Sequence, residues 1–135
     1  MVPRHITVGP GSTMGADDPV ISDAVQFGDL LLLSGRAPVD PATLQVLQGG
    51  FDAQASSVLA DIDAVLEAAG ASRAGVLRVE CFLADANDFP AWNRVWSEYF
   101  TPPRPARTTV VSGFAVPGIL IELQVTAAID RGGAS

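Results

Sequence analysis

The segment PARTTVVSGFAVPGILIELQV, residues 105–125, decides most of what the sequence predicts about the fold. Two runs of apolar and β-branched residues flank a Pro-Gly pair, which indicates two β-strands joined by a turn, and we expect these strands to pair with each other. Core strands usually carry apolar side chains, yet Arg107 lies in the first run and Glu122 in the second. The two charges are therefore the first candidates for a functional site.

The second strand alternates clearly between two kinds of residue. Side chains of one parity suit a face covered by helices: Ile121, Leu123, Val125, Ala127 and Ile129. Glu122 has the opposite parity, so the alternation predicts that its side chain points to the other face of the sheet. If Arg107 also faces that way, the two residues mark a polar spot on a largely apolar surface.

The segments before residue 105 predict four further strands and two helices. The strands are expected at residues 5–8, 24–27, 30–34 and 76–83. Apolar residues at helical spacing predict a helix over residues 51–69 that ends at Gly70, and a second helix over residues 89–100. Asp88 is expected to cap the second helix, and Pro90 suits its first turn.

The predicted order β-β-β-α-β-α-β-β describes an α+β fold in a single domain, residues 1–135. Two helices can cover one face of a sheet of about six strands. The other face needs a different cover, because the run LLLL at residues 30–33 is apolar at both parities. An apolar face of this kind usually marks an interface, so we expect a homo-oligomer whose sheets face inward.

Composition excludes several classes of function. The formal net charge is −7, which disfavours nucleic-acid partners, and the chain contains no lysine, which excludes Schiff-base and P-loop lysine chemistry. One histidine and one cysteine, His5 and Cys81, do not make a zinc site, so no metal site is expected. Without a secretory signal, a membrane-spanning run or a cysteine pair, the sequence predicts a cytoplasmic protein with no membrane partner.

Together the segments resemble the Rid family, also called the YjgF or endoribonuclease L-PSP family, of small imine and enamine deaminases. The similarity covers nearly the whole chain and is carried by six segments: SDAV, LLLLSGRAPVDPATL, VLADIDAVLEAAGAS, VLRVECFLADANDFPAWNRVWSEYF, PARTTV and VPGILIELQVTAAI. The resemblance implies a chorismate-mutase-like fold with a mixed sheet, and a homotrimer with active sites in clefts between subunits. It also implies cofactor-free hydrolysis of 2-imino acids to 2-keto acids and ammonia.

The resemblance also implies roles for individual residues. Arg107 in PARTTV matches the arginine that binds the substrate carboxylate, and Glu122 in LIEL matches the acid that positions or activates water. Gly35 and Thr109 match positions whose backbone lines the pocket, and Asn93 matches an asparagine on the pocket side.

Three positions depart from the family pattern. Ile21 stands where the deaminases often have tyrosine, Thr109 where they often have cysteine, and Arg36 where the motif SGQ has glutamine. Arg36 is therefore a candidate for a second contact with a substrate anion.

Four alternatives to a general imine deaminase stay open. Arg107 and Glu122 could form a structural ion pair instead of a catalytic pair. The substrate could be a larger, aminomuconate-like enamine dicarboxylate, for which Arg36 would supply the second cation. The chain could be a non-catalytic ligand-binding trimer, since the tyrosine and cysteine positions have changed. A ribonuclease is the fourth alternative, and the charge of −7 argues against it.

Overall fold

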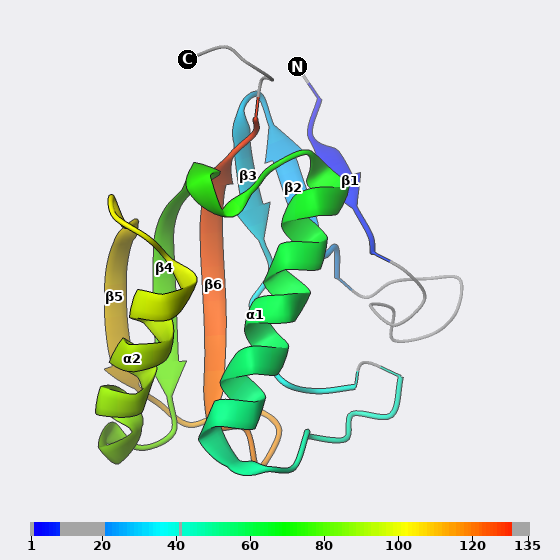
Figure 1. Ribbon diagram of the computed structural model, residues 1–135. Coiled ribbons are helices and arrows are strands. Elements are labelled where there is room, and N and C mark those ends of the chain that lie inside the picture. Colours follow the sequence, from blue (N-terminus) through cyan, green and yellow to red (C-terminus); the bar gives the residue numbers. More distant parts are fainter. Residues whose placement is uncertain (1, 9–20, 41, 131–135) are drawn as a thin grey trace.

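The computed structural model describes residues 2–8, 21–40 and 42–130. They form a six-stranded mixed sheet with two helices lying across one of its faces (Figure 1), which confirms the predicted fold class. The strands are β1 (Arg4–Ile6), β2 (Ala24–Phe27), β3 (Leu30–Leu33), β4 (Val76–Leu83), β5 (Ala106–Val111) and β6 (Ile121–Ala128). The helices are α1 (Gly50–Ala69) and α2 (Phe89–Tyr99), and two short 3₁₀ turns are η2 (Arg73–Gly75) and η3 (Ala86–Asp88).

The strand order, β1-β2-β3-β6-β4-β5, corrects one prediction. β5 and β6 do not pair with each other, because β4 lies between them. α2 crosses over the sheet between β4 and β5, so these strands run parallel, whereas β6 pairs antiparallel with both β4 and β3. Residues 112–120, which contain the Pro-Gly pair, therefore form a loop that passes the end of β4 and do not form a tight hairpin turn.

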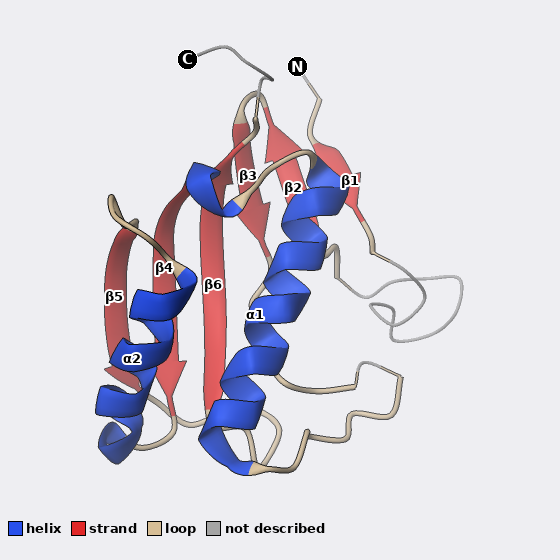
Figure 2. Cartoon of the chain, in the orientation of Figure 1, coloured by secondary structure: helices blue, strands red, loops and turns tan. Residues whose placement is uncertain are grey.

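The hydrophobic core lies between the sheet and the two helices (Figure 2). The predicted alternation of β6 is confirmed, since Ile121, Leu123, Val125 and Ala127 are all at most 2% exposed. α1 contributes an apolar stripe to the same core, and α2 contributes Trp92, which is fully buried. The largest fully buried side chains thus lie where the periodicity of the sequence places them.

The opposite face of the sheet is not covered by any helix of the described chain. Residues directly opposite one another in a sheet share a face, so the register assigns six apolar side chains to this uncovered face: Val25, Phe27, Leu30, Leu32, Phe82 and Val110. Leu30 and Leu32 are 49% and 52% exposed, while Leu31 and Leu33 between and after them are buried. The LLLL run is therefore buried on one side only within a single chain.

The helix ends agree with the sequence prediction at Gly70 and Pro90 and differ from it at Asp88. Gly70 ends α1 in the left-handed conformation, with φ of 80°, and Pro90 lies in the first turn of α2. Asp88 occupies the N-cap position of α2, but its side chain makes no capping hydrogen bond there. Asp85 instead accepts a hydrogen bond from the backbone N–H of Asn87 and stabilises the preceding 3₁₀ turn. None of the helices in the described chain has the length and hydropathy that a membrane span requires.

A polar cluster joins the C-terminal ends of the two helices. Arg73 donates two hydrogen bonds to the carboxylate of Asp63 on α1, from Nε at 3.0 Å and Nη2 at 2.8 Å. The hydroxyl of Tyr99 on α2 donates to the same carboxylate, and the Arg73 guanidinium stacks 3.8 Å from the Tyr99 ring centroid. Hydrogen bonding by Arg73 holds the pKa of Asp63 below its ordinary value.

This cluster should make stability depend on pH. A carboxyl group with a lowered folded-state pKa stabilises the fold above its unfolded pKa, near 3.9, and this contribution is lost as the pH falls through the folded value. We expect Arg73→Gln to lower the free energy of unfolding by about 1 kcal/mol or less at pH 7, because both side chains are partly exposed. Thermal melts should show the difference from the wild type shrinking below about pH 4. A difference that persists at pH 2 would contradict the assignment to Asp63.

Candidate functional site

Glu122 lies on the uncovered face of the sheet, as its strand parity predicts. It pairs in register with Phe82 on β4, and its carboxylate lies directly over Gly35. A Cβ atom added to Gly35 would be 2.6 Å from Oε2 of Glu122, so only glycine leaves room for the carboxylate in this position. Burial raises the pKa of Glu122 above its ordinary value. The chain thus presents a half-buried carboxylate beside the backbone of Gly35, which carries no side chain.

A local irregularity brings Gly35 under Glu122. Leu32 pairs with Thr126, but Arg36 pairs with Leu123, so four residues of one segment lie against three of the other. This extra residue is a bulge, and bulges change the direction in which side chains and backbone point. The pairing resumes with two backbone hydrogen bonds between Arg36 and Leu123, of 2.7 and 3.0 Å. Gly35 lies at the end of this bulge, and the Glu122 side chain extends over it from the opposite segment.

Arg107 lies on the helix-covered side of the edge strand β5. Its register partner on β4 is Val79, which is buried in the core under the helices. The guanidinium carbon lies 5.0 Å from the ring centroid of Trp96 and 5.6 Å from that of Phe89, both on α2. Of the arginines in the described residues, Arg107 alone has neither a hydrogen bond nor an ion pair with another described residue. Its hydrogen-bonding groups are free to bind a ligand.

Arg107 and Glu122 do not form an ion pair within the chain. They lie on strands separated by β4, and their register partners on β4, Val79 and Phe82, point to opposite faces of the sheet. The alternative that the two residues form a structural ion pair in one chain is therefore wrong, and so is the condition that they share a face. Within the part of the chain that the structure describes, neither of them has a countercharge in an ion pair.

Thr109 and Asn93 lie near Arg107 and far from Glu122 in the topology. Thr109 is two residues along β5 and pairs in register with Cys81, whose pKa is raised to about 11 by burial; Thr109, Trp92 and the charge of Arg107 partly offset this effect. The Cys81 thiol is consequently protonated and only 1% exposed, which suits a core residue. Asn93 lies on α2 one turn from both Phe89 and Trp96, on the side of the helix that faces Arg107.

Arg36 lies beside Gly35 as expected, but its charge is engaged within the chain. Its guanidinium points to the helix-covered side and is engaged by two carboxylates, those of Asp23 and Asp61. Nη1 is 2.7 Å from Asp23, and Nε and Nη2 are 2.6 and 3.0 Å from the two oxygens of Asp61. This arrangement weighs against the expectation that Arg36 offers a second cation to a substrate, because two carboxylates already compensate its charge.

Ile21 lies at the start of the described segment that leads into β2, and its side chain is 53% exposed. Ile21, Gly35 and Arg36 line one depression of about 810 Å³ together with Val8, Asp23, the loop at residues 37–48 and the side of α1 that carries Asp61. Within the described ranges, no three His, Cys, Asp or Glu side chains are grouped closely enough to hold a metal ion.

Sequence reasoning missed the contacts of four residues. Phe89 and Trp96 were assigned to one apolar stripe of α2, but Phe89 is 41% exposed and contacts Arg107 at the edge of the core. Asp23 and Asp61 were not recognised as partners of Arg36. Asp61 lies on the polar face of a predicted helix, where a carboxylate is common, so the sequence gives no indication of its contact with Arg36. Only the fold brings Asp61 to the end of β3.

Comparison with known proteins identifies the family. The profile of the Endoribonuclease L-PSP family matches residues 19–129, which is most of the chain, and the chain belongs to this family. A RutC family protein from Pyrococcus horikoshii is 38% identical over 117 residues, covering 85% of this chain and 93% of that protein. A Dermatophagoides farinae protein named 2-iminobutanoate/2-iminopropanoate deaminase is 39% identical over 112 residues, or 82% of this chain and 84% of that protein. The crystal structure of RidA from an Antarctic Psychrobacter superimposes with a TM-score of 0.77 at 32% identity, over 91% of this chain and 98% of that chain.

The close approach of Gly35 and Glu122 generates a prediction. In Gly35→Ala the new methyl group meets the mobile end of a side chain, so the carboxylate should move away at little cost, within about 0.5 kcal/mol. Gly75→Ala is the matched control, since its methyl group would lie 2.7 Å from the backbone carbonyl oxygen of Ala128. That clash cannot relax easily and should cost about 1–3 kcal/mol. Thermal melts compare the two variants, and equal losses would show that Glu122 is held rigidly over Gly35.

Proposed function

We propose that this chain is a cofactor-free hydrolase that converts 2-imino and 2-enamino acids to 2-keto acids and ammonia, in a homotrimer whose active sites lie between subunits. One observation carries the proposal. Arg107 and Glu122 have no ion-pair partner among the described residues, and they face opposite sides of one sheet. A single chain cannot bring them to one substrate, whereas Arg107 of one copy and Glu122 of another can meet across an interface.

The reaction needs one anion-binding group and one acid–base group. Arg107 binds the substrate carboxylate through two parallel hydrogen bonds, which fixes the plane of the adjacent C=N bond. The imine reacts in the form protonated on nitrogen. Glu122 accepts one proton from water as the water oxygen bonds to the imine carbon and the C=N π electrons move to nitrogen, which gives the neutral carbinolamine. Glu122 then delivers that proton to the nitrogen, the C–N bond breaks as the hydroxyl oxygen forms the C=O bond, and the hydroxyl proton passes to the departing ammonia, which leaves as ammonium. A 2-enamino acid first takes up a proton at carbon to become the imine.

The surroundings of Glu122 suit this exchange of protons. Burial raises its pKa, which brings the carboxyl group closer to the pH at which it must both accept and return a proton. Gly35 beneath it leaves room for a water molecule or a substrate atom next to the carboxylate. We propose that the backbone at Gly35 and the side chain of Ile21 line this half of the cleft.

The surroundings of Arg107 favour a substrate with a single carboxylate. Phe89 and Trp96 stack against the guanidinium and leave its hydrogen-bonding edge available. Thr109 and Asn93 lie beside it and complete this half of the cleft in the proposal. Arg36 is compensated by Asp23 and Asp61, so the feature that would have favoured a dicarboxylate enamine is lost. We therefore favour 2-imino acids with an uncharged side chain.

The uncovered face supports assembly from identical copies. It carries the apolar side chains of Val25, Phe27, Leu30, Leu32, Phe82 and Val110, and several of these are about half exposed. A second copy that buries this face also removes Glu122 from bulk water. The threefold symmetry is an inference from the family, and the name of the Dermatophagoides relative supports the activity. A net charge of −7 and the absence of lysine weigh against a ribonuclease.

The two charged residues should fail in different ways when they are substituted. Arg107→Ala should abolish imine hydrolysis by weakening carboxylate binding by about 2–5 kcal/mol. Arg107→Lys should restore little activity, because lysine lacks the planar guanidinium that forms two parallel hydrogen bonds with a carboxylate. Glu122→Gln should leave KM nearly unchanged and lower kcat by ~10²–10⁴. The measurement is ammonia release from imines generated by an amino-acid oxidase. Turnover at the wild-type rate by either variant would contradict the role proposed for the substituted residue. If the wild-type protein is folded and trimeric and binds these imines without turnover, it is a ligand-binding protein.

Mixing the two inactive variants tests whether sites are shared. When Arg107→Ala and Glu122→Gln chains are unfolded together and refolded at equal amounts, roughly one site in four should combine an intact Arg107 with an intact Glu122 of its neighbour. Activity should recover to that fraction of the wild type. Each variant refolded alone is the control. No recovery in mixed assemblies, confirmed by mass spectrometry, would show that both residues act within one chain.

A further inference from the structure

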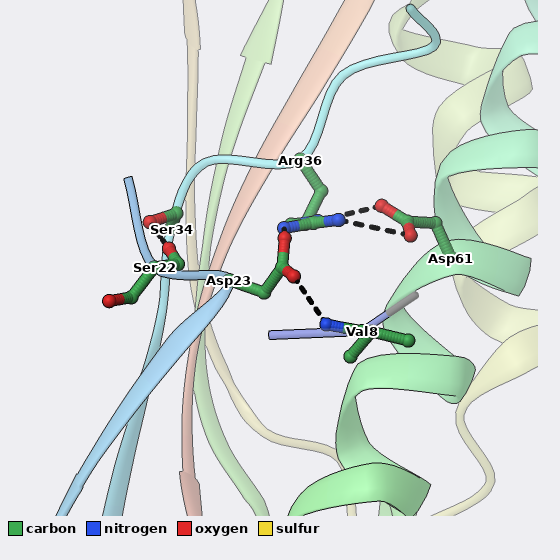
Figure 3. Close-up of polar contacts among 6 residues, drawn as sticks. All are labelled: Val8, Ser22, Asp23, Ser34, Arg36 and Asp61. Atoms are coloured by element: carbon green, nitrogen blue, oxygen red, sulfur yellow. Dashed lines mark hydrogen bonds and ion pairs between the residues drawn. The ribbon is translucent and has the colours of Figure 1, made fainter. Parts of the chain in front are cut away.

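Three charged residues, Asp23, Arg36 and Asp61, form a network between the sheet and α1 (Figure 3). Arg36 lies at its centre, with its guanidinium held by Asp61 of α1 on one side and by Asp23 at the entrance to β2 on the other. The second oxygen of Asp23 accepts a hydrogen bond of 2.7 Å from the backbone N–H of Val8. The network therefore ties α1, the start of β2 and the segment after β1 to one point.

The same residue, Arg36, is fixed to the strand that carries Glu122. Its backbone N–H donates to the carbonyl of Leu123 at 2.7 Å, and its carbonyl accepts from the N–H of Leu123 at 3.0 Å. Leu123 follows Glu122, and Gly35 precedes Arg36. The side chain of Arg36 thus anchors the position at which the bulge ends and β6 is paired again.

The network also reaches the segment that contains Ile21. The backbone N–H of Ser34 donates to the carbonyl of Asp23 at 2.9 Å, and the Ser34 hydroxyl donates to the carbonyl of Ser22 at 2.6 Å (Figure 3). These bonds hold the residues before β2 against the residues after β3. Ile21, Gly35 and Glu122 are therefore each adjacent in sequence to a residue that the network or its neighbouring hydrogen bonds hold in place.

We propose that Asp23, Arg36 and Asp61 are positioning residues, which hold the bulge and the Leu123 backbone so that the Glu122 carboxylate stays over Gly35. The proposal rests on the proposed function for its catalytic consequence. The proposal gives none of the three a contact with the reacting atoms, since their side chains lie on the helix-covered side of the sheet and Glu122 lies on the other. They act through the backbone of Arg36 and Leu123.

Charge explains why this network makes a rigid anchor. Asp23 is 2% exposed and the Arg36 side chain 11%, so neither charge is compensated by bulk water, and each needs the other in place. A planar guanidinium that binds three carboxylate oxygens from two segments fixes their relative orientation, which a single hydrogen bond would not do. Removing Arg36 or Asp23 would leave a buried charge unpaired and would threaten folding itself.

Asp61 is the residue at which the proposal can be tested without unfolding the protein. Its side chain is 39% exposed, so Asp61→Asn keeps the shape of the network while weakening its hold on Arg36. α1 offers a matched control in Asp63, which is 37% exposed and also binds an arginine, Arg73, through both oxygens. Asp63→Asn weakens a comparable ion pair on the same helix at a place that contacts neither Arg36 nor Leu123.

Two measurements on the full chain separate positioning from stability. Amide hydrogen exchange followed by NMR should show the Leu123 and Arg36 amides exchanging about tenfold faster in Asp61→Asn relative to the Ala127 amide, which lies on the same strand in the regular pairing with β3, with no such change in Asp63→Asn. Steady-state kinetics should show kcat reduced roughly tenfold in Asp61→Asn with KM within about twofold, and both constants near wild type in Asp63→Asn.

Each outcome decides the proposal. Unchanged relative exchange at Leu123 in Asp61→Asn overturns the positioning role, whether or not the protein is active. Faster exchange with an unchanged kcat overturns its catalytic consequence. Equal losses of kcat in both variants assign the effect to stability and also overturn the catalytic consequence of the positioning role. If the wild type releases no ammonia from any imine, the proposed function fails, and the exchange measurement alone still decides whether the network holds the backbone beside Glu122.

Discussion

The pairing of β6 with β3 on one side and β4 on the other is the constraint on which the rest of the structure depends. β6 is the one strand through which the two halves of the sheet are joined, so its alternation sets the faces of the whole molecule. Ile121, Leu123 and Val125 point to the helices and form the centre of the core. The same alternation leaves Glu122 on the other face, where no helix of the described chain covers it.

This chain has few charged residues, and the contacts of each one indicate its role. Arginines in the described residues either bind a carboxylate or a backbone or side-chain oxygen, with the exception of Arg107. A buried or half-buried charge without a partner costs stability, which is why unpaired charges such as Arg107 and Glu122 point to binding or catalysis. Arg36 shows the converse. Its charge is compensated by Asp23 and Asp61.

The two faces of the sheet divide the candidate site into halves. Gly35 and Glu122 form one half on the uncovered face, while Arg107, Thr109 and Asn93 gather around the edge strand and α2. Neither half has both an anion-binding group and an acid–base group. This division gives a physical reason for assembly that is separate from the burial of apolar surface, because a second copy would supply the missing group. The uncovered apolar face and the divided site thus lead to the same proposal.

The sequence by itself determined the elements, the face to which each side chain of β6 points and the family, because these depend on local periodicity and on short motifs. It identified Arg107 and Glu122 as exceptional because charge in an apolar strand is visible without coordinates. Only the tertiary structure decided that β4 separates β5 from β6, since strand order depends on crossover connections and not on adjacency in sequence. The tertiary structure alone decided the ion-pair partners of Arg36. These partners, Asp23 and Asp61, lie 13 and 25 residues away in the sequence and meet Arg36 only when α1 packs on the sheet.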